Sequence, residues 1–257
     1  MSAADRNTTA PHSSQLVPRD GEVRVWYATT TDAWSDADRT GRALSWLTTM
    51  ERLRYERYRH DVDREMFLLG RVMARTLVGQ ALGVEPRGWS WQENRYGRPE
   101  LSDKTTGLSF NLAHSAGVVV CAVSRGTDVG TDIEFRGRDA VDQRLVRRFC
   151  SPSEVADIES RGRDGWRDRF LQYWTLKEAY LKARGVGIAV HLSDLSFTLD
   201  DADVRVSFLN SLAGADPNWA FALSDTCDRH FIAAATPAPH GRRPTFRVEP
   251  LPLSALP

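Results

Sequence analysis

The sequence lacks the features that mark several common protein classes. Its three cysteines, Cys121, Cys150 and Cys227, are widely spaced and form no CxxC pair, which argues against a zinc site and a disulfide framework and suits a reducing cytoplasm. Lysine plus arginine and aspartate plus glutamate each number 34, so the basic excess of a broad nucleic-acid-binding surface is missing. No apolar run approaches the roughly 20 residues of a membrane span, and the N-terminus has no apolar signal core. We therefore expect a cytoplasmic protein that binds neither nucleic acid nor membrane.

Three familiar signatures are absent as well, namely GxxxxGK[ST], GxGxxG and GxSxG. Their absence argues against a P-loop site, a dinucleotide-binding loop and an α/β-hydrolase elbow. What remains is an ordinary globular composition, with 41% hydrophobic and 26% charged residues. The chain is long enough for one large domain or two compact halves.

Apolar periodicity predicts helices and strands in two successive halves. An alternating strand at 21–30 comes first, followed by a helical stretch at about 43–82 with a break near 60–61. Further strands are expected at 89–92, 108–113, 118–124 and 129–134. The second half is expected to contain helices at 141–149, 153–160 and 166–183 and strands at 195–199, 204–209, 219–224 and 230–236. Segments 110–124 and 221–236 both read as strand, polar turn and strand, which indicates an internal repeat unless two hairpins are alike by chance.

Two acidic residues, Asp132 and Glu134, flank Ile133 in the predicted strand 129–134. On a strand, residues i and i+2 point to the same face, about 6.5–7 Å apart, while the residue between them faces the other side. Two carboxylates this close repel each other unless a cation or a proton lies between them. A solvated strand end is the ordinary alternative for such a pair.

A predicted helix carries the next candidates. In WTLKEAYLKA (174–183), Glu178 and Lys182 are four residues apart and are therefore neighbours on the helix surface. An exposed Glu–Lys pair is the ordinary alternative. In FNLAHS (110–115), His114 follows a strand and could present its imidazole to a phosphate, together with nearby backbone N–H groups. A surface histidine is the alternative there.

Together these residues predict a magnesium site for a phosphate-bearing substrate. Asp132, Glu134 and Glu178 offer only oxygen ligands, which suits a hard cation such as Mg²⁺ and does not distinguish it from Mn²⁺. Mg²⁺ prefers few protein carboxylates and completes its shell with phosphate oxygens and water. Four side chains could neutralise the remaining phosphate charge: Lys177, Lys182, His114 and Arg98.

The sequence resembles the Sfp-type 4′-phosphopantetheinyl transferases over roughly residues 40–200. Five stretches match in the order of the family: YGRPEL (96–101), FNLAHS (110–115), VGTDIE (129–134), RRFCSPSE (147–154) and WTLKEAYLKARGVG (174–187). Each stretch alone is modest evidence. Five in order are hard to obtain by chance.

The resemblance implies a reaction, a cofactor and partners. It implies transfer of the 4′-phosphopantetheine group of coenzyme A to a serine of an apo acyl or peptidyl carrier protein, with release of 3′,5′-ADP. It implies Asp132, Glu134 and Glu178 as Mg²⁺ ligands, and catalytic roles for Glu178, Lys182 and His114. Glu178, or a water that it holds, would be the base that takes the serine proton.

The resemblance also implies contacts to coenzyme A. The expected contacts are Lys182 and Lys177 to the pyrophosphate, His114 to the phosphates, Arg98 to the nucleotide, and Arg54 and then Arg52 to the 3′-phosphate. Glu154 matches a further acidic position of the family. Ala113 stands where the family often has serine and Met66 where it commonly has arginine, so the adenosine end departs from the family pattern. Arg64 or Arg71 could substitute there.

The predicted fold is α+β, with two similar halves related by pseudo-twofold symmetry. Each half is expected to be a small antiparallel sheet packed on a long helix, with coenzyme A between the halves. The expected parts are a flexible tail at 1–20, an N-terminal half at 21–133, a C-terminal half at 134–240 and an irregular proline-rich tail at 241–257. Since both halves lie in one chain, a monomer suffices.

Two other functions stay open at this point. One is Mg²⁺-dependent hydrolysis of a nucleotide pyrophosphate, which would consume water and leave carrier proteins unmodified. The other is a catalytically silent module that binds coenzyme A or carrier proteins, which the departures at Ala113 and Met66 keep open. The type of carrier protein is not predicted, although the two-half architecture resembles enzymes of nonribosomal peptide and polyketide metabolism.

Overall fold

The computed structural model describes residues 16–137, 141–185, 190–200, 203–227, 229–238 and 243–257. Its helices are α1 (Thr30–Ala33), α2 (Ala37–Ser45), α3 (Thr49–Arg57), α4 (Asp61–Leu82), α5 (Gln143–Phe149), α6 (Pro152–Ser160) and α7 (Gly162–Arg184). Its strands are β1 (Glu22–Thr29), β2 (Trp91–Glu93), β3 (Pro99–Leu101), β4 (Leu108–Ser115), β5 (Val118–Arg125), β6 (Gly130–Phe135), β7 (Leu195–Asp200), β8 (Asp203–Phe208), β9 (Trp219–Ser224), β10 (His230–Pro237) and β11 (Thr245–Pro250). The α+β class is confirmed. In the described part of the chain, no helix is long and apolar enough to cross a membrane.

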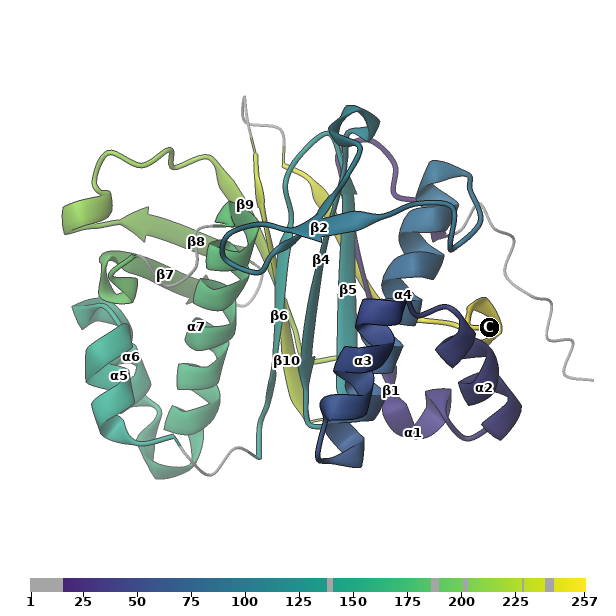
Figure 1. The fold of residues 1–257 in the computed structure, drawn as a ribbon. Coiled ribbons are helices and arrows are strands. Elements are labelled where there is room, and N and C mark those ends of the chain that lie inside the picture. The colour runs from purple at the N-terminus through teal and green to yellow at the C-terminus, as the bar shows by residue number, and fades with distance from the viewer. Residues whose placement is uncertain (1–15, 138–140, 186–189, 201–202, 228, 239–242) are drawn as a thin grey trace, which may run out of the picture.

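Two sheets lie face to face between two long helices, which gives four layers (Figure 1). The first sheet has the order β11-β1-β5-β4 and is covered on its outer face by α4. The second sheet has the order β6-β10-β9 and is covered by α7. Because residues alternate between the two faces of a strand, each strand can pack against a helix on one side and against the other sheet on its opposite side.

Strand β6 shows how this alternation places the acidic pair. Ile133 lies in the core between the two sheets, together with Ile232 of β10. The residues on either side of Ile133 therefore face α7, and both Asp132 and Glu134 accept hydrogen bonds from α7 side chains. The prediction that these two carboxylates share one face of a strand is confirmed.

A row of side chains on β4 holds the main chain of β6 and so joins the two sheets. The row consists of three hydrogen bonds, each from a β6-segment N–H to a β4 side chain twenty positions earlier: Val129 to Ser109 Oγ at 3.3 Å, Thr131 to Asn111 Oδ1 at 3.0 Å and Phe135 to Ser115 Oγ at 3.2 Å. Ala113 occupies the remaining position of this row and has no acceptor atom in its side chain. Its methyl group is 6% exposed and packs in the core between the sheets.

The structure corrects the expected tail at 241–257. Thr245–Pro250 forms β11, which pairs in parallel with β1, and Leu251 and Leu256 are buried beside it. The first sheet is therefore mixed rather than antiparallel. β11 is a short edge strand that follows several prolines, and its apolar alternation is too weak to predict a strand from the sequence. At the other end of the chain, Leu16 packs into the core, so the expected tail at 1–20 is wrong at that residue, and 1–15 lie outside the described residues.

The expected division at residues 133 and 134 falls inside β6. All ladder partners of β6 lie in β10, from Phe135 opposite His230 to Gly130 opposite Ala235. The second sheet therefore already begins at Gly130. The helical stretch expected at 43–82 contains parts of α2, α3 and α4, and the expected break near 60–61 coincides with the start of α4.

Candidate functional site

Helix α7 lies directly on β6 because a glycine removes the side chain between them. A Cβ atom added to Gly130 would stand 2.1 Å from the carbonyl oxygen of Ala179 and 2.2 Å from the amide nitrogen of Ala183. Only glycine allows this approach of two backbones. The close approach brings the face of α7 that carries Glu178 and Lys182 next to the acidic residues of β6.

Side chains at helical spacing on α7 contact the β6 carboxylates in turn. Trp174 Nε1 donates a hydrogen bond to Glu134 Oε1 at 2.8 Å, and Lys182 Nζ lies 2.7 Å from Asp132 Oδ1. Glu178 lies between these two positions on the same stripe of the helix. The structure thus brings together Asp132, Glu134, Glu178 and Lys182, as the sequence predicted.

Glu178 is a strongly perturbed acid of this cluster. Burial, then the negative charge of Asp132, raises the pKa of Glu178 to about 7, with Lys182 lowering it and Glu134 raising it further. Its Oε1 atom is buried and accepts no hydrogen bond from the described residues. An excess of negative charge therefore remains at this point, which a proton or a cation would neutralise.

His114 of β4 lies at the edge of the same cluster. Its ring is solvent-exposed, yet protein on several sides lowers the pKa of His114 through desolvation, and the charge of Lys182 lowers it further, against opposing effects of Asp63 and Asp132. The imidazole is thus mainly neutral at pH 7, so that it can donate one hydrogen bond and accept another.

The three carboxylates suit a hard divalent cation in donor type and in charge. They offer oxygen atoms alone, and the uncompensated Glu178 Oε1 is the kind of atom that a cation would engage. Among the described residues, however, no three His, Cys, Asp or Glu side chains already converge as a metal site. Lys182 holds Oδ1 of Asp132 instead, so a cation at that oxygen would have to replace the ion pair.

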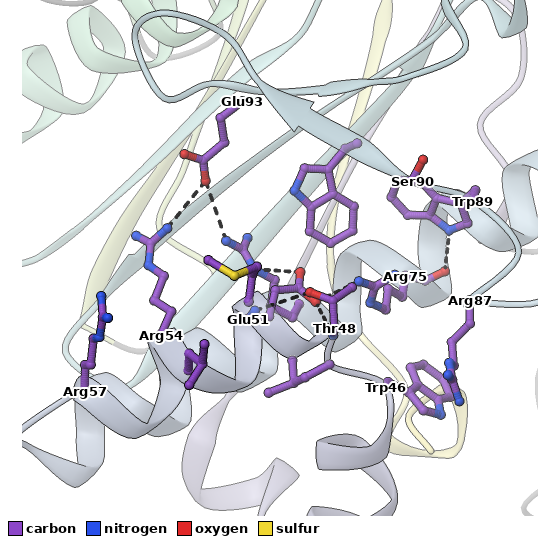
Figure 2. A pocket seen from close by; sticks show the side chains of 15 residues that line it. Trp46, Thr48, Glu51, Arg54, Arg57, Arg75, Arg87, Trp89, Ser90 and Glu93 are labelled. Carbon is purple, nitrogen blue, oxygen red and sulfur yellow. Dashed lines mark hydrogen bonds and ion pairs between the residues drawn. The ribbon is translucent and has the colours of Figure 1, made fainter.

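Two separate cavities lie near the predicted residues. The smaller, of about 200 Å³, is lined by Glu178 and Lys182 of α7, by Asn111 and Leu112 of β4 and by the turn between β2 and β3. The larger, of about 660 Å³, lies between α3, α4 and β2 and is shown in Figure 2. Its lining contains three tryptophans, two glutamates and five arginines: Arg54, Arg57, Arg71, Arg75 and Arg87. We call it the arginine cavity.

Ion pairs organise the inner wall of the arginine cavity. Glu51 forms ion pairs with Arg71 at 3.3 Å and Arg75 at 2.8 Å, and Glu93 lies 3.4 Å from Arg54. Figure 2 shows these pairs beneath the β2 segment. Of the expected 3′-phosphate contacts, Arg54 lines the cavity, whereas Arg52 lies outside it and pairs with Glu56 on the surface of α3. The sequence analysis did not identify Arg75 as a residue of this cavity. The pattern that could have indicated it is its position four residues after Arg71, in an apolar stretch of α4.

Comparisons with known proteins cover both halves of the chain. Residues 32–126 match a family model described as "4′-phosphopantetheinyl transferase, N-terminal", and residues 128–235 match one described as "4′-phosphopantetheinyl transferase superfamily". A phosphopantetheinyl transferase of Thraustochytrium sp. is 33% identical over 227 residues, which is 83% of this chain and 78% of that protein. The 4′-phosphopantetheinyl transferase HetI of Nostoc sp. is 31% identical over 243 residues, which is 94% and 98% of the two chains. The chain belongs to the 4′-phosphopantetheinyl transferase superfamily.

The resemblance found in the sequence is thereby confirmed, and with it the enzyme class. A crystal structure of holo-[acyl-carrier-protein] synthase from Neisseria meningitidis matches with a TM-score of 0.38 and 19% identity, over 43% of this chain and 96% of that one. The residues that the resemblance assigned to coenzyme A lie in different parts of this transferase, and the role expected of Lys177 needs correction.

Lys177 does not lie at the site. It is fully buried in the core of the C-terminal half, where Nζ lies 2.7 Å from Glu154 Oε2 and donates hydrogen bonds to the carbonyl oxygens of Leu192, at 2.8 Å, and Leu195. Burial lowers the pKa of Lys177 and raises that of Glu154, and each charge opposes the shift of the other. The expected contact with the pyrophosphate is therefore wrong, because a residue next to Glu178 in sequence is turned by about 100° around the helix.

Glu154 has a structural role for the same reason. Its two oxygens also accept the backbone N–H groups of Ser151 at 2.7 Å and Phe197 at 2.8 Å. It closes a capping box at the start of α6. The match to an acidic family position thus marks a buried link between α6, α7 and β7.

Arg98 is engaged by protein atoms. Its guanidinium donates hydrogen bonds to Ala183 O at 2.8 Å, Ser109 Oγ at 3.1 Å and Asp128 Oδ1 at 2.9 Å, and its side chain is 10% exposed. Arg98 also lines the smaller cavity beside Glu178 and Lys182, and its expected role at the nucleotide stays a prediction.

The two departures from the family pattern are also buried. Met66 is 5% exposed, and its Sδ accepts the N–H of Gly117 at 3.3 Å. Ala113 lies between the sheets, as described above. Of the two expected substitutes for an arginine at position 66, Arg71 lines the arginine cavity, whereas Arg64 bonds Tyr58 O at 3.1 Å beside it.

Proposed function

We propose that this transferase moves the 4′-phosphopantetheine group of coenzyme A to a serine of an apo carrier protein and releases 3′,5′-ADP, with Mg²⁺ as the cofactor and Mn²⁺ as the alternative. The observation that carries the proposal is the cluster of Asp132, Glu134, Glu178 and Lys182 in a member of this superfamily. Since both halves of the site lie in one chain, a monomer suffices.

Asp132, Glu134 and Glu178 would hold the metal ion. When bound, the ion supplies positive charge that neutralises the pyrophosphate and orients it. The partly uncompensated charge on Glu178 supports this assignment, because a raised pKa in a group of carboxylates indicates that a cation would bind favourably there.

The chain's own groups account for the proton movements. The serine oxygen attacks the β-phosphorus of coenzyme A, and the bond from that phosphorus to the bridging oxygen breaks, so that 3′,5′-ADP leaves with the electron pair. Glu178, or a water hydrogen-bonded to it, takes the serine proton; the water route is favoured because a cation lowers the proton affinity of a carboxylate. Lys182 faces the same cavity as Glu178 and stabilises the charge of the departing phosphate.

The arginine cavity is suited to hold the nucleotide end of coenzyme A. Its net positive charge and its volume of about 660 Å³ suit a phosphorylated nucleoside. Arg54 is the expected contact, and the charges of Arg54 and Lys182 both act on His114. We propose that His114 lies between the nucleotide end and the reacting pyrophosphate, where its neutral ring donates a hydrogen bond to a phosphate oxygen.

Intact-protein mass spectrometry tests the proposal. An apo carrier protein is incubated with the enzyme, coenzyme A and Mg²⁺, with parallel samples in EDTA, with Asp132→Asn and with Glu178→Gln. We expect the carrier to gain the mass of one phosphopantetheine, and to gain none in EDTA or with either variant. Glu159→Gln, which changes an exposed glutamate of α6, serves as the matched control and should retain full activity.

Two outcomes would contradict the proposal. If peptidyl and acyl carriers of several types remain unmodified while the enzyme splits coenzyme A, the reaction is hydrolysis. If coenzyme A binds and neither reaction occurs, the protein is a silent binding module.

A further inference from the structure

The last turn of α7 carries Lys182 and depends on contacts outside the helix. The last four carbonyl groups of a helix have no partner within it. Here Gly185, in the left-handed conformation at φ 62°, donates its N–H to Leu181 O at 3.0 Å and to Lys182 O at 3.2 Å. The next carbonyl, that of Ala183, accepts from Arg98 Nη1 at 2.8 Å.

Arg98 comes from the other half of the molecule. It follows the turn of the β2–β3 hairpin, and its second terminal nitrogen bonds Ser109 Oγ at the start of β4 and Asp128 Oδ1 just before β6. One guanidinium group thus joins the hairpin, the first sheet, the approach to β6 and the end of α7. Its positive charge also lies at the negative end of the helix, which is favourable.

The hairpin turn is shaped to make this contact. Asn94 Oδ1 accepts the N–H groups of Tyr96 at 2.9 Å and Arg98 at 3.1 Å, while Asn94 Nδ2 reaches Gly185 O at 3.4 Å. A Cβ atom on Gly185 would lie 3.1 Å from Arg98 Nη1 and 3.3 Å from Asn94 Nδ2. The hairpin therefore fits closely over the glycine that ends α7.

We propose that Arg98 is a positioning residue, and that the hairpin turn 94–98 clamps the last turn of α7 so that Lys182 and Glu178 stay aligned with β6. This inference rests on the proposed function for its catalytic consequence. A positioning role of Arg98 and a direct contact of Arg98 with the nucleotide predict different measurements. Loss of a positioning residue lowers kcat, because a small displacement of catalytic groups is costly, while the affinity for 3′,5′-ADP is retained.

The test compares Arg98→Met and Arg98→Lys with a matched control, Arg125→Met. Arg125 makes the corresponding bond in the N-terminal half, from Nη2 to Ala81 O at the end of α4, at 3.0 Å. Three quantities are measured for each protein: kcat and KM for coenzyme A, the dissociation constant of 3′,5′-ADP by calorimetry, and hydrogen exchange at the ends of α4 and α7.

For Arg98→Met we expect kcat to fall about ten-fold or more, with the 3′,5′-ADP dissociation constant changed less than about three-fold. Exchange should become about ten-fold faster at residues 181–185, since a charge-assisted hydrogen bond is lost there. Arg98→Lys, which can replace one bond but not all of those that the guanidinium makes, should recover part of the rate and part of the protection. Arg125→Met should speed exchange at the end of α4 only and leave kcat unchanged.

Three results would overturn the inference. A ten-fold loss of 3′,5′-ADP affinity in Arg98→Met would make Arg98 a nucleotide contact. Unchanged exchange at 181–185 would show that the hairpin does not hold the helix end. An unchanged kcat with faster exchange would limit Arg98 to stability. If the wild-type enzyme transfers no phosphopantetheine, the proposed function fails, and the exchange measurement still decides whether the clamp exists.

Discussion

Replacing Glu178 by glutamine should stabilise the metal-free protein, and more so at high pH. Burial and the charge of Asp132 raise the pKa of Glu178 to about 7, from 4.5 in an unperturbed chain. The folded state therefore binds this proton more tightly than the unfolded state does. The free energy of unfolding falls as the pH rises from about 4.5 through about 7, because ionised Glu178 is disfavoured in the folded protein. Glutamine has a similar shape and cannot ionise.

The pKa difference sets the size of the effect. A shift from 4.5 to about 7 corresponds to at most about 3 kcal/mol once Glu178 is fully ionised, at about 1.4 kcal/mol for each pKa unit. Most of this appears between pH 5 and pH 8.5. For a chain of this length, each kcal/mol moves the melting temperature by about 2–4 °C, so the variant should gain roughly 6–12 °C over the wild type at pH 8.5.

Thermal melting in EDTA at pH 5 and pH 8.5 measures this directly. Glu159→Gln on the surface of α6 is the control and should melt at the wild-type temperature at each pH. Added Mg²⁺ should raise the melting temperature of the wild type at pH 8.5 and leave Glu178→Gln little changed, since ligand binding to the folded state stabilises it. If the variant melts at or below the wild-type temperature at pH 8.5, the carboxylate cluster does not strain the folded protein and the argument for a cation site is refuted.

Three further predictions concern packing around the site. Gly130→Ala should lower the melting temperature by more than about 10 °C, because the added carbon meets the backbone of α7 at 2.1 Å. The control is Gly41→Ala, whose added carbon meets nothing within 4 Å; equal melting temperatures of the two variants would contradict the close approach. Glu154→Gln should lower the free energy of unfolding in urea by about 3–5 kcal/mol, because it leaves the charge of Lys177 buried without its partner. The double variant with Lys177→Met should recover much of this stability; additive losses from the two substitutions would disprove the pair. Ala113→Ser should complete the hydrogen-bond row between β4 and β6 and raise the free energy of unfolding by about 1 kcal/mol. The affinity for coenzyme A should stay unchanged; a changed affinity would mean that this position faces the ligand.

The sequence by itself determined which candidate side chains share a face within one strand or one helix. The two-residue period of a strand placed Asp132 and Glu134 on one face, and the helical spacing placed Glu178 and Lys182 on one stripe. Both patterns follow from local backbone geometry, which depends little on the rest of the chain. The glycine of VGTDIE, by contrast, has its reason in a tertiary contact, the approach of α7 to Gly130.

Only the tertiary structure decided which residues turn away from the site. Lys177 is adjacent to Glu178 in sequence but lies in the core, because the partner that accepts its charge, Glu154, comes from another helix. Arg98 closes the end of α7, 85 positions further along the chain. β11 pairs with β1 across nearly the whole chain length. These contacts join segments that are distant in sequence, and the periodicity of one segment contains no information about the partner it will meet.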